Sequence, residues 1–433
     1  MAYPPSCVSP LGSSSLFFGI QRSSVTSVRA VPGSRWIRSI VIALGLLLLN
    51  PACSYGQEIA NRWEVGPDRP TAEMRFGWSV ALEDGIVVVG APGDATNGPK
   101  AGAAYVFEWA NGDWVRTKLL PPNGEANARF GWKVGVDNGR IAVTAPWASN
   151  PVPGRSGKIH LYRRSGSSWQ PHLLRVGDPA VEGQIGRGLA MAGGRLIAGA
   201  PYDSTANGKA SGSIIVFEES ADGWTSQTLT PARGTSDAWF GLTVAATDTH
   251  VGAGAYHTDQ PTGPEAGAAF LFNLSADGTW RETALAPMVE PARKDHFGRS
   301  LAFLGKKIFV GAEEDDNETG TNAGGVFGLR LDAPDRLAML ITPSDGASRT
   351  YFGFALAATD RYLAASHGAE VHLFSGFDAS IVQDRRLKAL SGRSLPASVT
   401  ALAGSGRHLV VGSAYADDPG PDAGYVEVVE FAP

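Results

Sequence analysis

The sequence contains little cysteine, and this limits how a fold can be stabilised. Only Cys7 and Cys53 are present among 433 residues, and both lie within the first 56. A disulfide framework is therefore excluded for the rest of the chain, and so is chemistry that depends on a thiol. Packing and hydrogen bonding must hold that part together.

Long apolar runs are also missing. Residues 40–49 form an apolar stretch of ten residues, about half the length that a transmembrane helix needs. In residues 1–56 the only charges are positive and precede this stretch: Arg22, Arg29, Arg35 and Arg38. This pattern predicts a secretory leader, so we expect no membrane span and a protein that is secreted, periplasmic or on the cell surface. Cys53 follows the apolar stretch and keeps a lipoprotein open as an alternative.

Positively charged residues are fewer than negatively charged ones, with 37 Lys and Arg against 42 Asp and Glu. The formal net charge is −5, and removal of the four leader arginines takes it to −9. This balance disfavours a nucleic-acid partner. Sustained helical apolar patterns are absent beyond the leader, whereas 54 glycines and 28 prolines suit many short strands joined by turns.

Three short motifs recur in one order, and the first of them recurs at intervals of 54 to 57 residues. Phe-Gly or Ile-Gly begins at Phe76, Phe130, Ile185, Phe240, Phe297 and Phe352. Gly-Ala-Pro or a relative of it begins at Gly90, Thr144, Gly199, Gly254, Gly311, Ala365 and Gly412. A small residue followed by glycine then precedes an apolar run, as at Ala101-Gly102. Such a period indicates an array of similar structural units.

Each unit is predicted to be a four-stranded antiparallel meander. In the first unit, residues 78–82 alternate in polarity, and residues 86–89 form a β-branched run typical of a strand covered on both faces. Residues 103–109 and 114–120 follow, and Asn111-Gly112 between them is a strong hairpin signal.

Four-stranded units at this period predict an all-β fold, a seven-bladed β-propeller. We expect one domain over residues 57–433, with blades starting near residues 76, 130, 185, 240, 297, 352 and 398. The last unit is one strand short. Residues 57–70 are predicted to complete it, with residues 61–67 pairing with residues 425–431.

The Phe-Gly, Gly-Ala-Pro and Gly-rich motifs resemble the FG-GAP repeat of integrin α-subunit propellers and of many bacterial secreted proteins. The resemblance implies an extracellular adhesion or protein-binding module. Relatives often hold calcium in an Asp-x-Asp-x-Asp-Gly loop, but the corresponding turns, such as Glu83-Asp84-Gly85, are too short to supply six oxygens. We therefore expect no metal and no other cofactor, and leave open weak cation binding by the acidic residues 313–317.

The longer loops follow Gly-Ala-Pro and precede Phe-Gly, and in this topology both sets lie on one face. Variable loops on a rigid scaffold commonly carry recognition. The candidate ligand-binding residues on them are Trp147, Tyr202, Tyr256, Tyr415, Asp94, Asp203 and Asp259. Aromatic groups there offer flat apolar surfaces for a sugar or a protein.

Polar residues also repeat three positions before Phe-Gly, at Glu73, Asn127, Glu182 and Asp237. Repetition in register favours a structural task for them. A ring of carboxylates around the central opening is the competing hypothesis.

No nucleophile with its base, HExxH pair, Walker loop or dinucleotide motif stands in a plausible context, so no catalytic residue is assigned. We expect a monomeric, non-catalytic module that recognises an extracellular protein or glycan through the loop face. The alternative is a polysaccharide hydrolase or lyase with its site at the central opening.

Overall fold

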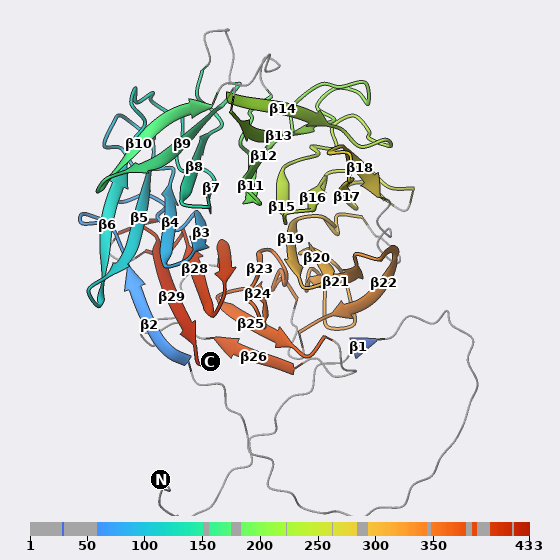
Figure 1. Ribbon diagram of the computed structural model, residues 1–433. Coiled ribbons are helices and arrows are strands. Elements are labelled where there is room, and N and C mark those ends of the chain that lie inside the picture. The colour runs from blue at the N-terminus through green and yellow to red at the C-terminus, as the bar shows by residue number, and fades with distance from the viewer. Residues whose placement is uncertain are drawn as a thin grey trace, which may run out of the picture.

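The computed structural model describes residues 28–29, 59–149, 156–174, 183–221, 223–261, 263–283, 293–343, 348–377, 383–387, 399–417 and 420–433. All regular elements in these ranges are β-strands, arranged as seven sheets around a common axis (Figure 1). The predicted seven-bladed β-propeller of four-stranded antiparallel blades is confirmed. Within the described residues, no helix has the length and apolar character that crossing a membrane requires.

The first three blades take their strands in chain order. Blade one comprises β3 (Ser79–Glu83), β4 (Ile86–Ala91), β5 (Ala103–Ala110) and β6 (Asp113–Leu119). Blade two comprises β7 (Val134–Asp137), β8 (Arg140–Ala145), β9 (Lys158–Ser165) and β10 (Ser168–Leu174). Blade three comprises β11 (Gly188–Ala192), β12 (Arg195–Ala200), β13 (Ser213–Ser220) and β14 (Gly223–Leu229).

The next three blades repeat this order. Blade four comprises β15 (Thr243–Ala246), β16 (His250–Gly254), β17 (Ala269–Leu274) and β18 (Trp280–Thr283). Blade five comprises β19 (Ser300–Leu304), β20 (Lys307–Ala312), β21 (Gly325–Arg330) and β22 (Ala333–Ile341), and the two-residue β1 (Val28–Arg29) pairs with β22. Blade six comprises β23 (Leu356–Ala358), β24 (Leu363–His367), β25 (Glu370–Ser375) and β26 (Gln383–Leu387).

Blade seven joins the two ends of the described chain. Its strands are β27 (Ala401–Ser405), β28 (His408–Ser413), β29 (Tyr425–Phe431) and β2 (Ile59–Val65). In Figure 1 the blue β2 lies beside the red β29, with Trp63 opposite Val428 and Val65 opposite Val426. The predicted closure is confirmed, and its physical consequence is that β29 presents no unpaired edge.

Burial follows the position of a strand within its blade. The second strands are almost wholly buried; Val87, Val88 and Val89 in β4 have no exposed surface because each face packs on an adjoining blade. An outermost strand such as β14 is mostly exposed, which matches its polar sequence GWTSQTL. The core therefore lies in layers between blades.

The recurring motifs are the residues that join one blade to the next. Phe130 of the second Phe-Gly pair is buried and forms a parallel bridge with Gly102 of blade one; Phe240 pairs in the same way with Gly212. Gly102 has a φ of +88°, and a Cβ there would lie 2.0 Å from the carbonyl oxygen of Phe130. Only glycine allows this approach.

The polar positions before Phe-Gly have a structural role in the backbone. Glu73, Asn127 and Asp237 are exposed and have left-handed φ values of 58°, 65° and 58°. Their backbone N–H groups donate to carbonyl oxygens of the preceding blade. Asparagine and aspartate tolerate this conformation, which accounts for the repetition without a ring of carboxylates. Glu182 lies outside the described residues.

Candidate ligand-binding channel

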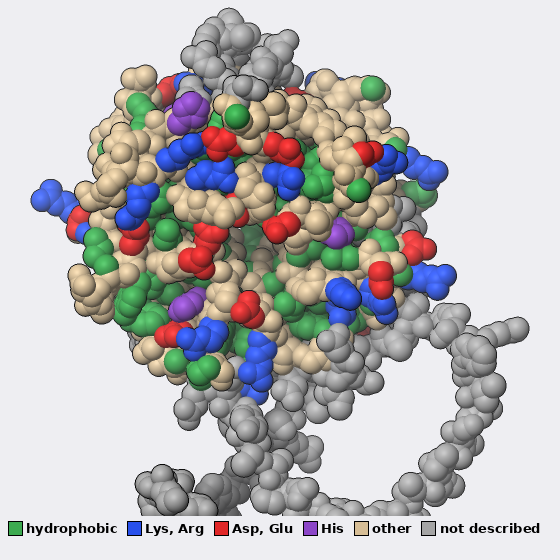
Figure 2. Space-filling view, viewed as in Figure 1, with side chains coloured by type: hydrophobic (Ala, Val, Ile, Leu, Met, Phe, Trp, Pro, Cys, Tyr) green, Lys and Arg blue, Asp and Glu red, His purple; other side chains and the backbone are tan. Residues whose placement is uncertain are grey.

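A cavity of about 470 Å³ lies on the ring axis, at the beginning of the innermost strands. On the face that Figure 2 shows, charged side chains of both signs stand around a central hollow. All seven blades contribute to the cavity, through residues that include Ser79, Lys133, Arg187, Thr243, Ser300, Phe354 and Thr400. This size is within the range of about 300 to 1,000 Å³ that is usual for small-molecule sites.

The repeat determines which residues reach the channel. The residue directly after Phe-Gly lies at its mouth: Trp78, Trp132, Arg187, Leu242, Arg299 and Phe354. Because the Phe is locked into the preceding blade, the following residues begin the innermost strand and face the axis. Six blades thus supply one equivalent side chain each, and the positions that follow along the innermost strands add further lining residues, so the chemistry of the channel depends on which residue each blade has there.

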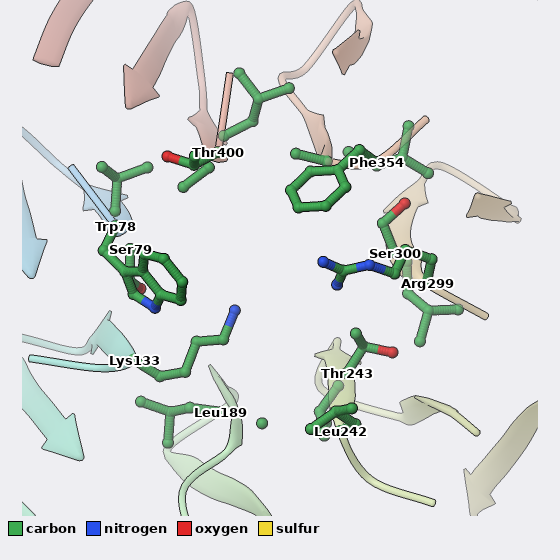
Figure 3. Close-up of a pocket in the computed structure, with 18 of the residues that line it drawn as sticks. Trp78, Ser79, Lys133, Leu189, Leu242, Thr243, Arg299, Ser300, Phe354 and Thr400 are labelled. Carbon is green, nitrogen blue, oxygen red and sulfur yellow. The ribbon is translucent and has the colours of Figure 1, made fainter. Parts of the chain in front are cut away.

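Three of the lining residues are cationic. Arg187 and Arg299 directly follow the glycine of the motif, and Lys133 stands one position later, after Trp132. Lys133 and Arg299 extend toward the middle of the cavity from different blades (Figure 3), and Arg187 also lines it. Among the described residues, the lining contains no Asp or Glu. Burial, and after it the positive charges of Arg299 and Arg187, lower the pKa of Lys133 from 10.5 to about 8.

The two arginines are held differently. The Arg187 guanidinium lies 4.8 Å from the ring centre of Trp132 and 4.7 Å from that of Trp147. Its Nε is buried and donates no hydrogen bond to a described residue, and burial lowers its pKa. Arg299 lies 4.1 Å from the ring centre of Phe354, and its Nε lies 3.0 Å from Oε1 of Glu313.

Aromatic and cationic groups surround the mouth of the channel in contact with one another. The first arc runs from blade seven to blade three: Tyr415, Trp78, Trp132, Trp147, Arg187 and Tyr202. Ring centres of Trp78 and Trp132 are 4.5 Å apart. Such stacked pairs are stabilising beyond the area they bury.

The second arc continues to blade six: Trp239, His257, Tyr256, His296, Arg299 and Phe354. Tyr202 joins the arcs, with its ring centre 5.3 Å from that of Trp239. We call the two arcs together the collar. It presents flat apolar faces and fixed positive charge around one opening.

The predicted aromatic site residues lie in the collar. Trp147, Tyr202, Tyr256 and Tyr415 are half-buried there, and Tyr256 and Tyr415 also line the channel. Their role in ligand binding stays a prediction. The collar also includes residues that sequence reasoning left out, namely Trp78, Trp132 and Phe354. Their shared position after Phe-Gly is the signal that identifies them.

The predicted aspartates accept hydrogen bonds from residues of their own blades. Asp94 is 4% exposed and accepts hydrogen bonds from Tyr105 (2.9 Å), Lys118 (2.8 Å) and the backbone of Thr96 (2.8 Å). Burial alone would raise the pKa of Asp94, but the bonds from Lys118 and Thr96 outweigh it and lower that pKa.

Asp203 and Asp259 have similar local roles. The hydroxyl of Ser213 donates to Asp203 at 2.5 Å, and burial raises the pKa of Asp203. Asp259 is exposed and accepts the backbone N–H of Glu265 at 3.0 Å. None of the three predicted aspartates lines the channel.

The acidic residues 313–317 do not form one cluster. Glu313 turns to Arg299 and His296, while Asp315 is 7% exposed and accepts a bond from Asn317 at 3.2 Å. Burial raises the pKa of Asp315 to about 7, aided by the nearby Asp295 and Asp316. In the described part of the chain, no group of three or more His, Cys, Asp or Glu side chains is arranged to hold a metal ion.

Comparisons with known proteins agree with this architecture. The family model of the FG-GAP repeat matches residues 68–107 and 114–162, which span blades one and two. No curated protein matches the chain. Similar solved structures include one described as U3-55K and a crystal structure of the RRP9 WD40 repeats, each with 12% identity and a TM-score of 0.54.

These alignments cover 87% of this chain and 100% and 99% of the two solved chains. At such low identity they show the propeller fold and no shared function. The family match lies in the first two blades, and the seven-bladed ring repeats the same four-stranded unit around the axis. The chain is a seven-bladed β-propeller that carries FG-GAP repeats in its first two blades.

Proposed function

We propose that the protein is a secreted, non-catalytic binding module that recognises an extracellular protein or glycan through the loop face. The observation that carries this proposal is the collar. Aromatic and arginine side chains are the groups that most often dominate binding energy, and here they are fixed by stacking around one opening. Preorganised side chains lose little entropy when a ligand binds.

FG-GAP repeats are typical of extracellular proteins, which supports secretion with the positively charged, apolar leader of residues 1–56. The leader lies largely outside the described residues. A two-carboxylate hydrolase requires its acid groups about 5 to 10 Å apart at the substrate. Since the described channel lining is cationic, the geometry favours binding over that reaction.

Glycan and cell-surface-protein arrays test the proposal, with the intact mature protein as probe. Trp147→Ala and Tyr415→Ala should each weaken binding of the partner found by about 1 to 3 kcal/mol. Trp109→Ala is the matched control, because Trp109 is 43% exposed on β5 and lies outside the collar. A partner whose binding responds to Trp109→Ala and not to the collar variants would contradict the proposal.

A further inference from the structure

The channel concentrates positive charge in an acidic protein. Lys133, Arg187 and Arg299 come from blades two, three and five and line one cavity, whereas the chain as a whole has a formal net charge of −5. In the described residues, Glu313 pairs with Arg299, but no carboxylate lies within ion-pair distance of Lys133 or Arg187. Burying cations without a charged partner is costly, so stability does not explain the presence of Lys133 and Arg187 in the channel.

Lys133 also departs from the structural role of its position. In blades four and five the equivalent residues are Thr243 and Ser300, whose hydroxyls donate to the Phe-Gly carbonyl of the next blade, at 2.7 Å to Gly298 and 2.6 Å to Gly353. These bonds hold neighbouring blades together. A lysine cannot replace a short hydroxyl in this contact.

In blade two a different residue makes the bond. Thr144 stands where most Gly-Ala-Pro motifs have glycine, and its hydroxyl donates to the carbonyl of Gly186 at 2.8 Å. The inter-blade contact is therefore kept while position 133 is free to carry an ammonium group into the channel. Lys133 and Thr144 both depart from the repeat, and together they bring one positive charge into the channel while the inter-blade bond is kept. This combination indicates a binding site.

We propose that the channel binds an oxyanion, a carboxylate or sulfate, that is carried by a sugar ring. Lys133 and Arg187 supply charge-assisted donors for the anion, including the buried Arg187 Nε. The cavity of about 470 Å³ has the size of a small-molecule site, and the collar at its mouth offers aromatic faces on which a sugar ring stacks. This inference rests on the proposed function and names the ligand class of the same face.

The test is calorimetric titration of the intact mature protein at pH 7 and constant ionic strength with glucuronate, glucose, sodium sulfate and N-acetylglutamate. We expect glucuronate to bind, sulfate to compete with glucuronate, and glucose not to bind. Lys133→Ser restores the hydroxyl usual at this position and should weaken glucuronate binding at least ten-fold. Arg187→Met should do the same. Arg281→Gln removes an exposed cation of β18, whose side chain is 67% exposed, and should change nothing.

Several outcomes would overturn the inference. Equal binding of glucose and glucuronate would show that the anion is not recognised. Equal binding of N-acetylglutamate and glucuronate would show that the sugar ring is not recognised. Absence of any anion binding would refute the channel as the binding site. An equal loss of glucuronate affinity in Arg281→Gln would refute it as well. If an array partner binds through the collar with affinity unchanged by Lys133→Ser, the proposed function stands and this inference fails. Unfolding curves establish that each variant is folded.

Discussion

Replacing Lys133 by methionine should stabilise the unliganded protein. Methionine keeps the unbranched shape of the lysine stem and removes its charge. In the folded state, burial and the positive charges of Arg299 and Arg187 lower the pKa of Lys133 from 10.5 to about 8. Arg187 and Arg299 are the charged groups that line the channel with it, and Tyr256 and Tyr415 are the other titratable ones.

The size of the effect follows from the pKa. A fall from 10.5 to about 8 corresponds to about 3 kcal/mol at a pH below both values. Lys133 is half-buried and faces a cavity wide enough for water, whose screening reduces this figure. We expect the free energy of unfolding at pH 7 to rise by about 1 to 3 kcal/mol in Lys133→Met, with a Tm higher by about 1 to 4 °C.

The pH dependence distinguishes this cause from improved packing. Between pH 8 and 10.5 the unfolded chain holds a proton at Lys133 that the folded chain has lost, so the wild-type protein gains stability as the pH rises through this window. The advantage of Lys133→Met should therefore be complete at pH 7 and nearly gone at pH 10.5. Denaturant unfolding across this range measures it. A variant that is no more stable at pH 7, or whose advantage does not shrink, would refute the reasoning.

Three further predictions concern the ring and its loops. A chain beginning at Thr71 lacks β2 and leaves β29 unpaired, so it should melt well below the mature protein in a calorimetric scan; equal Tm values would contradict closure by β2. Gly102→Ala should lower the free energy of unfolding by about 2 to 4 kcal/mol, because its Cβ would meet the Phe130 carbonyl; Gly112→Ala, in an open turn, is its control for spatial conflict. Chelator should change Tm by less than about 2 °C; a larger fall reversed by calcium would show that residues 313–317 bind a cation.

The sequence by itself determined the architecture, since each step from residues to fold is local. Alternation in residues 78–82, the buried β-branched run at 86–89 and the Asn111-Gly112 turn define one meander. Six Phe-Gly or Ile-Gly pairs and a seventh relative of Gly-Ala-Pro at Gly412 give the number of blades. The missing strand of the last unit was also visible, because residues 61–67 carry the pattern of an outermost strand. The extent of the leader and of a single domain over residues 57–433 stays a prediction.

Only the tertiary structure decided what the loop residues do. Asp94 has the sequence context of an exposed loop acid, yet folding brings Tyr105 and Lys118 to it from neighbouring strands and uses its oxygens inside the blade. Lys133, Arg187 and Arg299 are separated by 54 and 112 positions in the sequence, and their place just after Phe-Gly or Ile-Gly does not by itself show that they face one another. They meet because each blade directs residues of its innermost strand to the axis, and ring closure brings these residues into a single cavity where their charges interact.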